Sequence, residues 1–318
     1  MATTISQKIQ NRIIDPLLMI FYNTVVKAYI QRIGSRDNRK LKYYVSACLI
    51  FKDEGPFLKE WLDYHLTIGV EHFYLYDNNS SDNYLEIVQP YIDKGLVTLV
   101  NWPYHAAQAK AYKNCLETYR GESNWITFID ADEFIVPRYD TDIKTWVKRF
   151  DKYPAIVIKW LMFGTNNKVK HDYGKNVIEQ YYACWDHFYK NGKCFVNTRY
   201  DLTNWNTQFF HHHSYMRYPL FGINISLPAV NQWGYICRGI RSWGGKGDQM
   251  KNRTIQINHY FCKALDIYEA KMSKSDVFYK KNPKSLDVMF GHDQKCITRD
   301  YTIERFLLKM KMRQGLVK

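Results

Sequence analysis

Three carboxylates stand within four positions of the stretch 125–137, namely Asp130, Asp132 and Glu133. Large apolar residues occupy positions 125–129 before them, and Phe134-Ile135-Val136 follows them. This pattern predicts a buried strand that ends in an acidic turn. Ionised carboxylates beside a buried strand are costly unless a cation or hydrogen-bond donors meet them. The stretch therefore indicates a divalent metal and its charged ligand, and the alternative is a solvated acidic turn.

The elements before this turn alternate in type. Residues 43–51, 70–76, 96–102 and 125–129 read as strands, and the segments between them have helical apolar spacing, ended by Gly69, Gly95 and Gly121. The helix after residue 83 is predicted to begin with a capping box of Asn83 and Glu86. Four strand–helix alternations with short joints imply right-handed crossovers and a parallel sheet.

Polar residues cluster where three of these strands end: Lys52, Asp53 and Glu54, then residues 77–82, then residues 130–133. Ligands collect at the carboxyl edge of such sheets. Convergence of the three clusters at this edge favours the metal site over the solvated turn.

The second half of the chain has a different pattern of expected helices and strands. A short helix is expected at 142–150 and a strand at 155–160, and residues 177–262 are strand-like and rich in Tyr and Trp. Helices are expected at 263–275 and 303–312. The predicted fold is α/β, with a mostly parallel nucleotide-binding sheet and a mixed C-terminal lobe for a second substrate. The segments are a basic N-terminal segment (1–42), a catalytic domain (43–275) and a basic helical extension (276–318).

Composition narrows the class of protein. The formal net charge of +14 indicates polyanionic partners. No Arg-rich repeat, zinc-finger spacing or RNA-binding motif occurs, so nucleic acid is excluded as the specific partner. The seven cysteines are scattered without a CxxC pair, which favours a reducing cytosol over a disulfide framework.

The N-terminal segment lacks the pattern of a secretory signal. Residues 13–30 are apolar enough for an amphipathic helix but are interrupted by Asp15, Pro16, Asn23 and Lys27. With its basic flank, the helix fits either an anionic membrane surface or the protein's own body. The expected location is cytoplasmic, peripheral at the inner face of the membrane; for a eukaryotic source the alternative is the Golgi membrane.

Several motifs in a fixed order carry a resemblance to a known family. Residues 51–65, 69–78, 125–137, 160–164 and Asn258-His259-Tyr260, with Lys271 in the following helix, resemble glycosyltransferase family 92 and its bacterial relatives. These are similar to the family 2 glycosyltransferases and have GT-A folds. The resemblance covers residues 43–275 and implies a metal-dependent glycosyltransferase, inverting, with a nucleotide-sugar donor that is usually UDP-linked. Galactose is common among animal members.

The resemblance also implies roles for residues of this chain. Asp130, Asp132 and His259 would form the site for Mn²⁺ (or Mg²⁺). Asp132 would bind the metal directly, Asp130 would contact ribose or a metal-bound water, and His259 would be a third metal ligand or a phosphate contact. Carboxylate-held metals neutralise the charge that develops on a diphosphate leaving group. Residues expected to contact the nucleotide are Lys52, Asp53, Glu54, Asp77, Asn78, Gln108 and Lys110. Asn78 departs from the commoner Asp, which leaves base selectivity open.

The sequence assigns the residues that contact the acceptor less specifically than those that contact the nucleotide. An inverting transfer needs a base near the acceptor hydroxyl, and Glu133, Asp186 and Asp248 are candidates. Phe163 and Gly164 resemble an acceptor-side loop, with Trp160 as a stacking platform for a glycan or lipid-linked acceptor. The triplet 211–213 of histidines is interpreted as mostly structural, because consecutive strand residues cannot all face one ion. The competing hypothesis is a non-catalytic sugar- or membrane-binding protein that keeps the fold.

Overall fold

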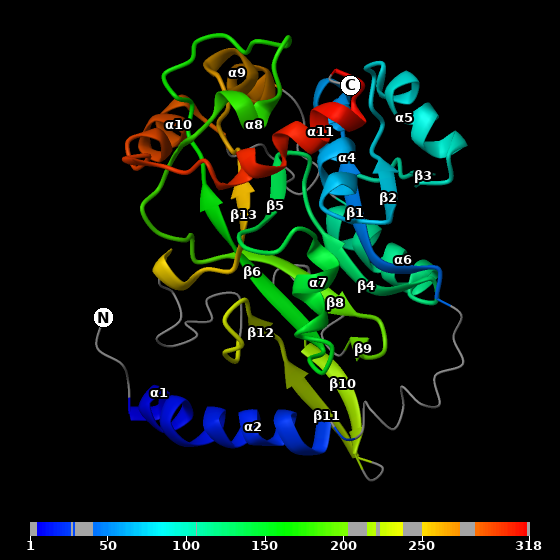
Figure 1. The fold of residues 1–318 in the computed structure, drawn as a ribbon, viewed down its shortest axis with the longest axis vertical. Helices are drawn as coiled ribbons and strands as arrows, with labels where there is room; N and C mark the ends of the chain where they lie inside the picture. The colour runs from blue at the N-terminus through cyan, green and yellow to red at the C-terminus, as the bar shows by residue number, and fades with distance from the viewer. Residues whose placement is uncertain are drawn as a thin grey trace.

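A central nine-stranded sheet organises the protein, with strand order β3-β2-β1-β4-β8-β6-β13-β5 and β12 paired to β6. The structure, a computed structural model, describes residues 5–26, 28, 41–105, 107–202, 215–220, 223–237, 250–273 and 284–316. Helices cover the sheet on both sides, and the N-terminal helices lie apart at the lower edge (Figure 1).

The first half of the sheet is parallel. Its strands are β1 (Tyr43–Phe51), β2 (His72–Asp77), β3 (Val97–Asn101) and β4 (Ser123–Phe128). The intervening helices are α4 (Gly55–Thr67), α5 (Tyr84–Asp93) and α6 (Gln108–Tyr119). β1 and β2 are buried along almost their whole length, as the continuous apolar runs predict for strands covered on both faces. The expected alternation and parallel pairing are confirmed.

The second half of the sheet is mixed. β6 (Ala155–Met162), β13 (Ile255–His259) and β12 (Val230–Asn231) form parallel pairs, whereas β8 (Gly192–Asn197) and β5 (Glu133–Pro137) pair antiparallel with their neighbours. The expected α/β class with a mostly parallel sheet is therefore confirmed.

Shorter elements complete the body. They are α7 (Ile143–Lys148), α8 (Val177–Gln180), β7 (Ala183–Cys184), β9 (Asp201–Leu202), β10 (Tyr215–Leu220), β11 (Ile223–Pro228), η4 (Met250–Asn252), α9 (Leu265–Ser273), α10 (Leu286–Asp293), β14 (Thr298–Arg299), η5 (Thr302–Phe306) and α11 (Leu307–Arg313). The sequence pattern does not predict α10, because Met289 and His292 are its only buried residues and leave little apolar periodicity.

The capping box predicted at Asn83 is wrong. The Asn83 side chain makes no capping hydrogen bond in the structure. The Asp82 carboxylate instead accepts hydrogen bonds from the backbone amides of Gly55 (2.7 Å) and Tyr84 (3.3 Å). A Cβ at position 55 would lie 2.8 Å from Asp82 Oδ2, so this contact requires glycine. One carboxylate thus joins the starts of α4 and α5.

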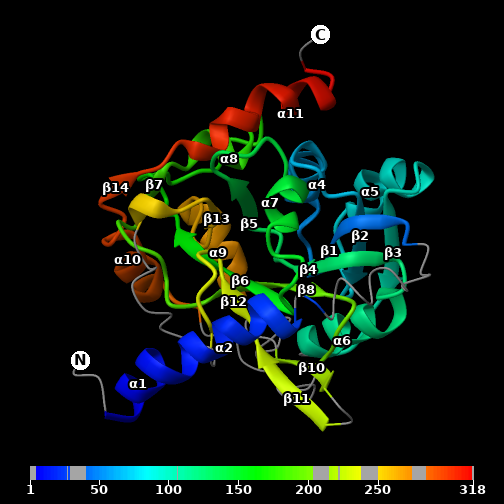
Figure 2. The same ribbon diagram turned by 60° about the horizontal axis from the view of Figure 1, so that its bottom comes forward.

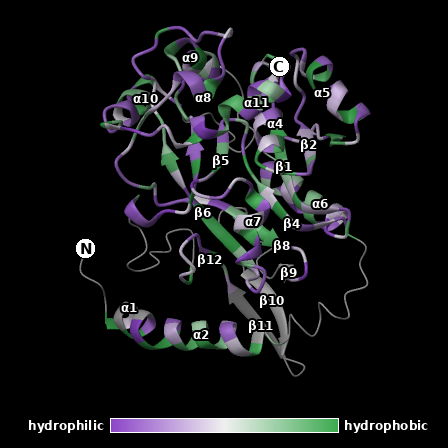
Figure 3. Cartoon of the chain, in the orientation of Figure 1, coloured by the Kyte–Doolittle hydropathy of each residue, from purple (hydrophilic) through white to green (hydrophobic). Residues whose placement is uncertain are grey.

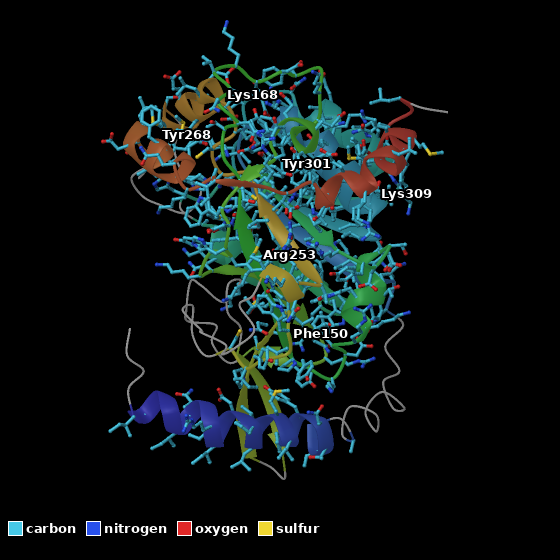
Figure 4. The ribbon with its side chains drawn as sticks, turned by 60° about the vertical axis from the view of Figure 1, so that its left-hand side comes forward. Phe150, Lys168, Arg253, Tyr268, Tyr301 and Lys309 are labelled. Carbon is cyan, nitrogen blue, oxygen red and sulfur yellow. The ribbon has the colours of Figure 1, made fainter. Side chains whose placement is uncertain are left out.

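The segment 284–316 packs against the rest of the body. Asp300 accepts a hydrogen bond from Arg253 at 2.5 Å, and Asp293 accepts from the backbone amide and the hydroxyl of Thr165. Figure 4 shows Lys309 of α11 at the outer edge of the molecule, and the buried side of α11 packs on α4. The three-segment division expected from the sequence stays a prediction.

The N-terminal helices α1 (Ile5–Ile9), η1 (Gln10–Ile14), α2 (Asp15–Phe21) and η2 (Tyr22–Val26) run along the bottom of the molecule (Figure 2). Tyr22 is fully buried and donates its hydroxyl hydrogen to the Pro228 carbonyl at 2.6 Å. Large apolar side chains remain exposed on the other side, among them Ile5, Ile13, Leu17 and Ile20, and Figure 3 shows hydrophobic colouring along these helices. None of the helices in the described residues combines the length and apolar character needed to cross a bilayer.

Candidate active site

The acidic turn lies at the carboxyl end of β4 and is held by backbone contacts. The Glu133 amide donates to the Asp130 carbonyl at 3.0 Å, which closes the turn. The indole Nε1 of Trp61, in α4, donates to the Asp130 and Glu133 carbonyls, both at 3.1 Å. A buried helix residue therefore fixes the position of the turn relative to the sheet.

The Asp130 carboxylate is surrounded by donors. It accepts hydrogen bonds from Gln108 Nε2 (3.1 Å), the Tyr112 hydroxyl (3.0 Å) and Lys193 Nζ (2.9 Å). Burial alone would raise the pKa of Asp130, but Lys193 outweighs it and the pKa is lowered. The sequence prediction missed Lys193, although a lysine inside the apolar strand Gly192–Asn197 is a sign of a buried cation.

Asp132 lies between two cationic or potentially cationic side chains. Its carboxylate accepts a hydrogen bond from Lys271 Nζ at 2.7 Å, and His259 Nε2 is 3.5 Å away. Burial opposes ionisation, but Lys271 and His259 hold the pKa of Asp132 well below its usual range. Lys271 comes from α9 and His259 from β13, so elements far apart in sequence meet at this carboxylate.

Sheet register brings Glu133 to the same point. Glu133 is the direct partner of His259 in the antiparallel β5–β13 pair. Its side chain is fully buried, with Lys193 Nζ 3.7 Å from Oε1. Burial raises the pKa of Glu133 well above its usual range, with Asp130 and Asp132 adding to the rise and Lys193 opposing it.

Asp132, Glu133 and His259 form a possible metal site. Each offers one ligand atom, and these atoms lie within 4.8 Å of one another. Glu133 Oε1 and His259 Nδ1 are buried and have no hydrogen-bond partner within the part of the chain that the structure describes, which is costly unless a ligand satisfies them. Two carboxylates and an imidazole fit a divalent cation such as Mn²⁺. Of the three metal ligands expected from the sequence, Asp132 and His259 belong to this group, while Asp130 faces Lys193.

Several residues expected to contact the nucleotide lie at the ends of β1 and β2, where they hydrogen-bond to backbone groups of the neighbouring loops. Asp53 accepts from the Ser81 amide at 2.6 Å, and Asp77 accepts from the Ser80 amide at 2.9 Å. Asn78 donates to the carbonyls of Trp102 (2.7 Å) and Tyr104 (2.8 Å), after β3. The strand-end clusters therefore meet at one edge of the sheet.

The other residues expected to contact the nucleotide differ in burial. Glu54 raises the pKa of Lys271, which places its charge near the Asp132 cluster. Lys52 is half-buried after β1, and Lys110 is exposed on α6. Gln108 is buried and bonded to Asp130, as described above. Contact of any of these residues with a nucleotide stays a prediction.

The residues expected to contact the acceptor lie in different surroundings. The Trp160 ring packs 4.9 Å from the His259 ring, beside the metal-ligand group. Phe163 is fully buried against Tyr260, and a Cβ on Gly164 would lie 2.3 Å from Asp293 Oδ1, so both are enclosed. Their role with an acceptor stays a prediction.

The remaining candidate bases lie outside this cluster or outside the described residues. Asp186 is exposed and accepts a hydrogen bond from His187 at 2.5 Å. Asp248 and the histidines at 211–213 lie outside the described residues. The base remains a prediction with three candidates, of which Glu133 lies among the metal ligands.

Comparison with known proteins identifies the family. Residues 21–266 match Glycosyltransferase family 92. A family 92 protein from Ricinus communis is 34% identical over 118 residues, covering 36% of this chain and 20% of that protein. A galactan beta-1,4-galactosyltransferase, GALS2 of Arabidopsis thaliana, is 26% identical over 155 residues, covering 45% of this chain and 30% of its own length. The chain thus aligns with a third or less of the length of these curated relatives.

Solved structures show a weaker likeness. S. aureus TarS 1–349 in complex with UDP has a TM-score of 0.34 and 15% identity, with 49% of this chain and 47% of that chain covered. Open α/β sheets bind their ligands at the carboxyl edge, where the acidic cluster of this protein lies. The chain belongs to glycosyltransferase family 92.

Proposed function

We propose that the protein transfers a hexose from a nucleotide-sugar, UDP-linked, to a glycan or lipid-linked acceptor with inversion, and that the transfer depends on Mn²⁺ or Mg²⁺. The observation that carries the proposal is the group Asp132, Glu133 and His259, which offers ligand atoms within 4.8 Å of one another beside a β-strand end. When bound, the ion would neutralise charge on the donor diphosphate as a Lewis acid. The imidazole favours Mn²⁺, since Mg²⁺ prefers oxygen ligands alone.

The proposed sugar is galactose. Support comes from the likeness to proteins named galactan beta-1,4-galactosyltransferases, GALS2 and GALS3. The proposal for galactose comes from these relatives and not from a contact of a described residue with the sugar, so a comparison of turnover between donors tests it. UDP-galactose, UDP-glucose, UDP-N-acetylglucosamine and GDP-mannose form the panel that tests it.

In the proposed reaction, side chains of this protein position the substrates and offset charge. Lys193 and the donors around Asp130 keep that carboxylate ionised. Trp160, largely buried beside His259, would stack on a sugar ring of the acceptor. Glu133, Asp186 or Asp248 would accept the acceptor hydroxyl proton. Replacing each by its amide identifies the base as the residue whose loss abolishes transfer while UDP binding persists.

Donor turnover with and without Mn²⁺ tests the proposal. In wild type, chelation of the metal is expected to abolish hydrolysis or transfer, and Asp132→Asn is expected to lower turnover by about 100-fold or more. Asp142→Asn is the matched control, because Asp142 caps α7 through the Thr145 amide and asparagine also caps well. Equal turnover in wild type and Asp132→Asn would overturn the metal assignment. Absence of both UDP and Mn²⁺ binding in calorimetry would favour a non-catalytic sugar- or membrane-binding protein.

The proposed place of action is an anionic membrane surface, at the cytoplasmic face or, in a eukaryotic source, at the Golgi. Exposed apolar residues along α1–η2, such as Ile5 and Leu17, together with Arg12 on the same helices, support it. Flotation with phosphatidylserine-containing liposomes measures the association. Leu17→Ser combined with Ile20→Ser is expected to reduce it, and unchanged flotation would overturn the membrane proposal while leaving the transfer proposal intact.

A further inference from the structure

Lys263 is a buried lysine whose ammonium lacks a hydrogen-bond acceptor among the described residues. Only 1% of its surface is exposed. It lies between β13 and α9, with a backbone φ of 48°, in the left-handed region that non-glycine residues rarely adopt. A buried ammonium that lacks an acceptor is costly, and such costs are typical of places where a ligand completes the site.

Two of the three carboxylates that act on Lys263, those of Glu60 and Asp132, already accept hydrogen bonds from other groups. Glu60 accepts hydrogen bonds from the amides of Val177 (2.7 Å) and Ile178 (3.0 Å), at the start of α8. Asp132 accepts from Lys271 at 2.7 Å. The Nζ atom of Lys263 packs over an aromatic ring, at 4.3 Å from the centroid of Phe57. Burial and, after it, Lys271 lower the pKa of Lys263 to about 8, against the opposing effect of Asp132, Glu54 and Glu60.

These observations describe a cationic position that lacks an anion and lies beside the acidic cluster. Asp132 and Lys271 both act electrostatically on Lys263, so the position is close to the possible metal group. A ligand that contacts both the possible metal group and Lys263 must carry strong negative charge at the atoms that contact them. A diphosphate meets this requirement, because its oxygens can accept from an ammonium on one side and bind a cation on the other.

We propose that Lys263 binds the diphosphate of the nucleotide-sugar donor and stabilises it as the leaving group. The inference rests on the proposed function and adds a residue to it. In the transfer, the acceptor oxygen forms a bond to the anomeric carbon as the bond from that carbon to the phosphate oxygen breaks. The electron pair of the broken bond passes to the diphosphate, and the acceptor proton passes to the base. Lys263 offsets the negative charge that grows on the diphosphate.

Two variants of the full-length protein test the proposal. Lys263→Met removes the charge and keeps the packing on Phe57, while Lys263→Arg keeps the charge. Lys309→Met, on the exposed side of α11, is the control. Calorimetry with UDP, uridine and inorganic pyrophosphate, each with Mn²⁺, separates the diphosphate from the base and from a free anion.

The expected result has two parts. Lys263→Met lowers UDP affinity by about 10- to 100-fold and leaves uridine affinity unchanged, with Lys263→Arg in between. The same variant raises the melting temperature of the ligand-free protein, because an unpaired buried charge is removed. A purely structural lysine gives the reverse pattern, in which Lys263→Met melts earlier or fails to fold and UDP affinity is unchanged. That pattern overturns the proposal.

Failure of this inference and failure of the proposed function are distinguishable. If wild type binds UDP and turns over a donor while Lys263→Met binds UDP equally well, only the role of Lys263 is wrong. If wild type neither binds UDP nor turns over any donor of the panel, the proposed function is wrong and the inference falls with it. Binding of pyrophosphate but not UDP would show a general anion site and would also contradict the proposal.

Discussion

Two lysines at the acidic cluster balance three carboxylates in different ways. Lys271 Nζ lies 2.7 Å from Asp132, whereas Lys193 Nζ lies 2.9 Å from Asp130 and 3.7 Å from Glu133. Lys193 is 1% exposed and lies 2.9 Å from the carboxylate of Asp130, whose pKa it lowers, so removal of the lysine leaves an ionised carboxylate without its nearest compensating charge. Lys193 is therefore central to the stability of the site.

Lys193→Met is expected to lower the free energy of unfolding by about 3 to 5 kcal/mol, as is typical when one partner of a buried pair is removed. Urea denaturation measures it. The control is Lys113→Met, which breaks an exposed pair with Glu117 and should cost less than about 1 kcal/mol. Similar losses in the two variants would contradict the role given to Lys193.

His65 makes stability depend on pH. Its ring lies fully buried, with Nδ1 bonded to the Trp61 carbonyl (2.8 Å) and Nε2 accepting from the Ile135 amide (3.4 Å). Burial lowers the pKa of His65 to about 3, against 6.5 for an ordinary histidine. Because the unfolded chain binds the proton more readily, this contribution is fully present above pH 6.5 and is lost as pH falls toward 3.

Between pH 6.5 and pH 4, the free energy of unfolding is expected to fall by about 1.4 kcal/mol per pH unit through His65. Burial raises the pKa of Glu60 to about 7, which gives the opposite slope between 4.5 and 7. The comparison of wild type with His65→Gln isolates the histidine, since Glu60 is common to both. Parallel pH profiles of stability for the two proteins would exclude His65 as the cause.

At the scale of elements, helix α4 sets the geometry of the acidic turn through a single side chain. The Trp61 indole donates to both ends of the turn, at Asp130 and Glu133. Trp61→Phe keeps the ring and removes the donor. We expect Mn²⁺ affinity to fall by about tenfold, as for other groups that orient metal ligands, and stability to fall by about 1 to 3 kcal/mol.

Trp146 provides the matched control for that prediction. Its Nε1 donates to Thr254 Oγ1 at 2.9 Å from α7, and its ring is also fully buried. Trp146→Phe should lower stability by a similar amount without changing Mn²⁺ affinity. Isothermal titration of both variants with Mn²⁺ separates the two effects, and equal affinities would show that the turn does not depend on α4.

The sequence predicts the elements better than their contacts. Apolar runs and glycine positions are enough to predict β1, α4 and the parallel order of the first half, because strand and helix periods are local properties. Asp132 and His259 were expected to meet only through the family resemblance. The apolar strand around Lys193 indicates a buried cation, but the contact of Lys193 with Asp130 and the position of Lys263 could not be predicted, because both depend on register and burial across distant segments.

At the scale of the whole molecule, the C-terminal segment is packed into the body. Phe306 is buried and its ring meets Tyr64 of α4 edge-on, at 6.1 Å between centroids. Met310 of α11 is fully buried as well. The segment 284–316 should therefore unfold together with the sheet.

Phe306→Ala is expected to destabilise the protein by about 3 to 5 kcal/mol in a single transition, because the cavity opens in a shared core. Leu308→Ala, at a side chain that is 63% exposed, should change stability by less than about 0.5 kcal/mol. Thermal unfolding followed by far-UV and near-UV circular dichroism measures both. Two separate transitions in the wild type would show that the C-terminal segment folds independently.

The pairing of β5 with β13 makes tolerance to insertions and deletions uneven along the chain. Glu133 and His259 are direct partners in this pair, and successive side chains of a strand point to opposite faces. One residue gained or lost inside β13 would turn His259 away from Asp132, while the same change outside the strand would leave the register intact. Length variation among natural relatives should therefore avoid both strands and collect in the joints between elements, even where the strand residues themselves vary.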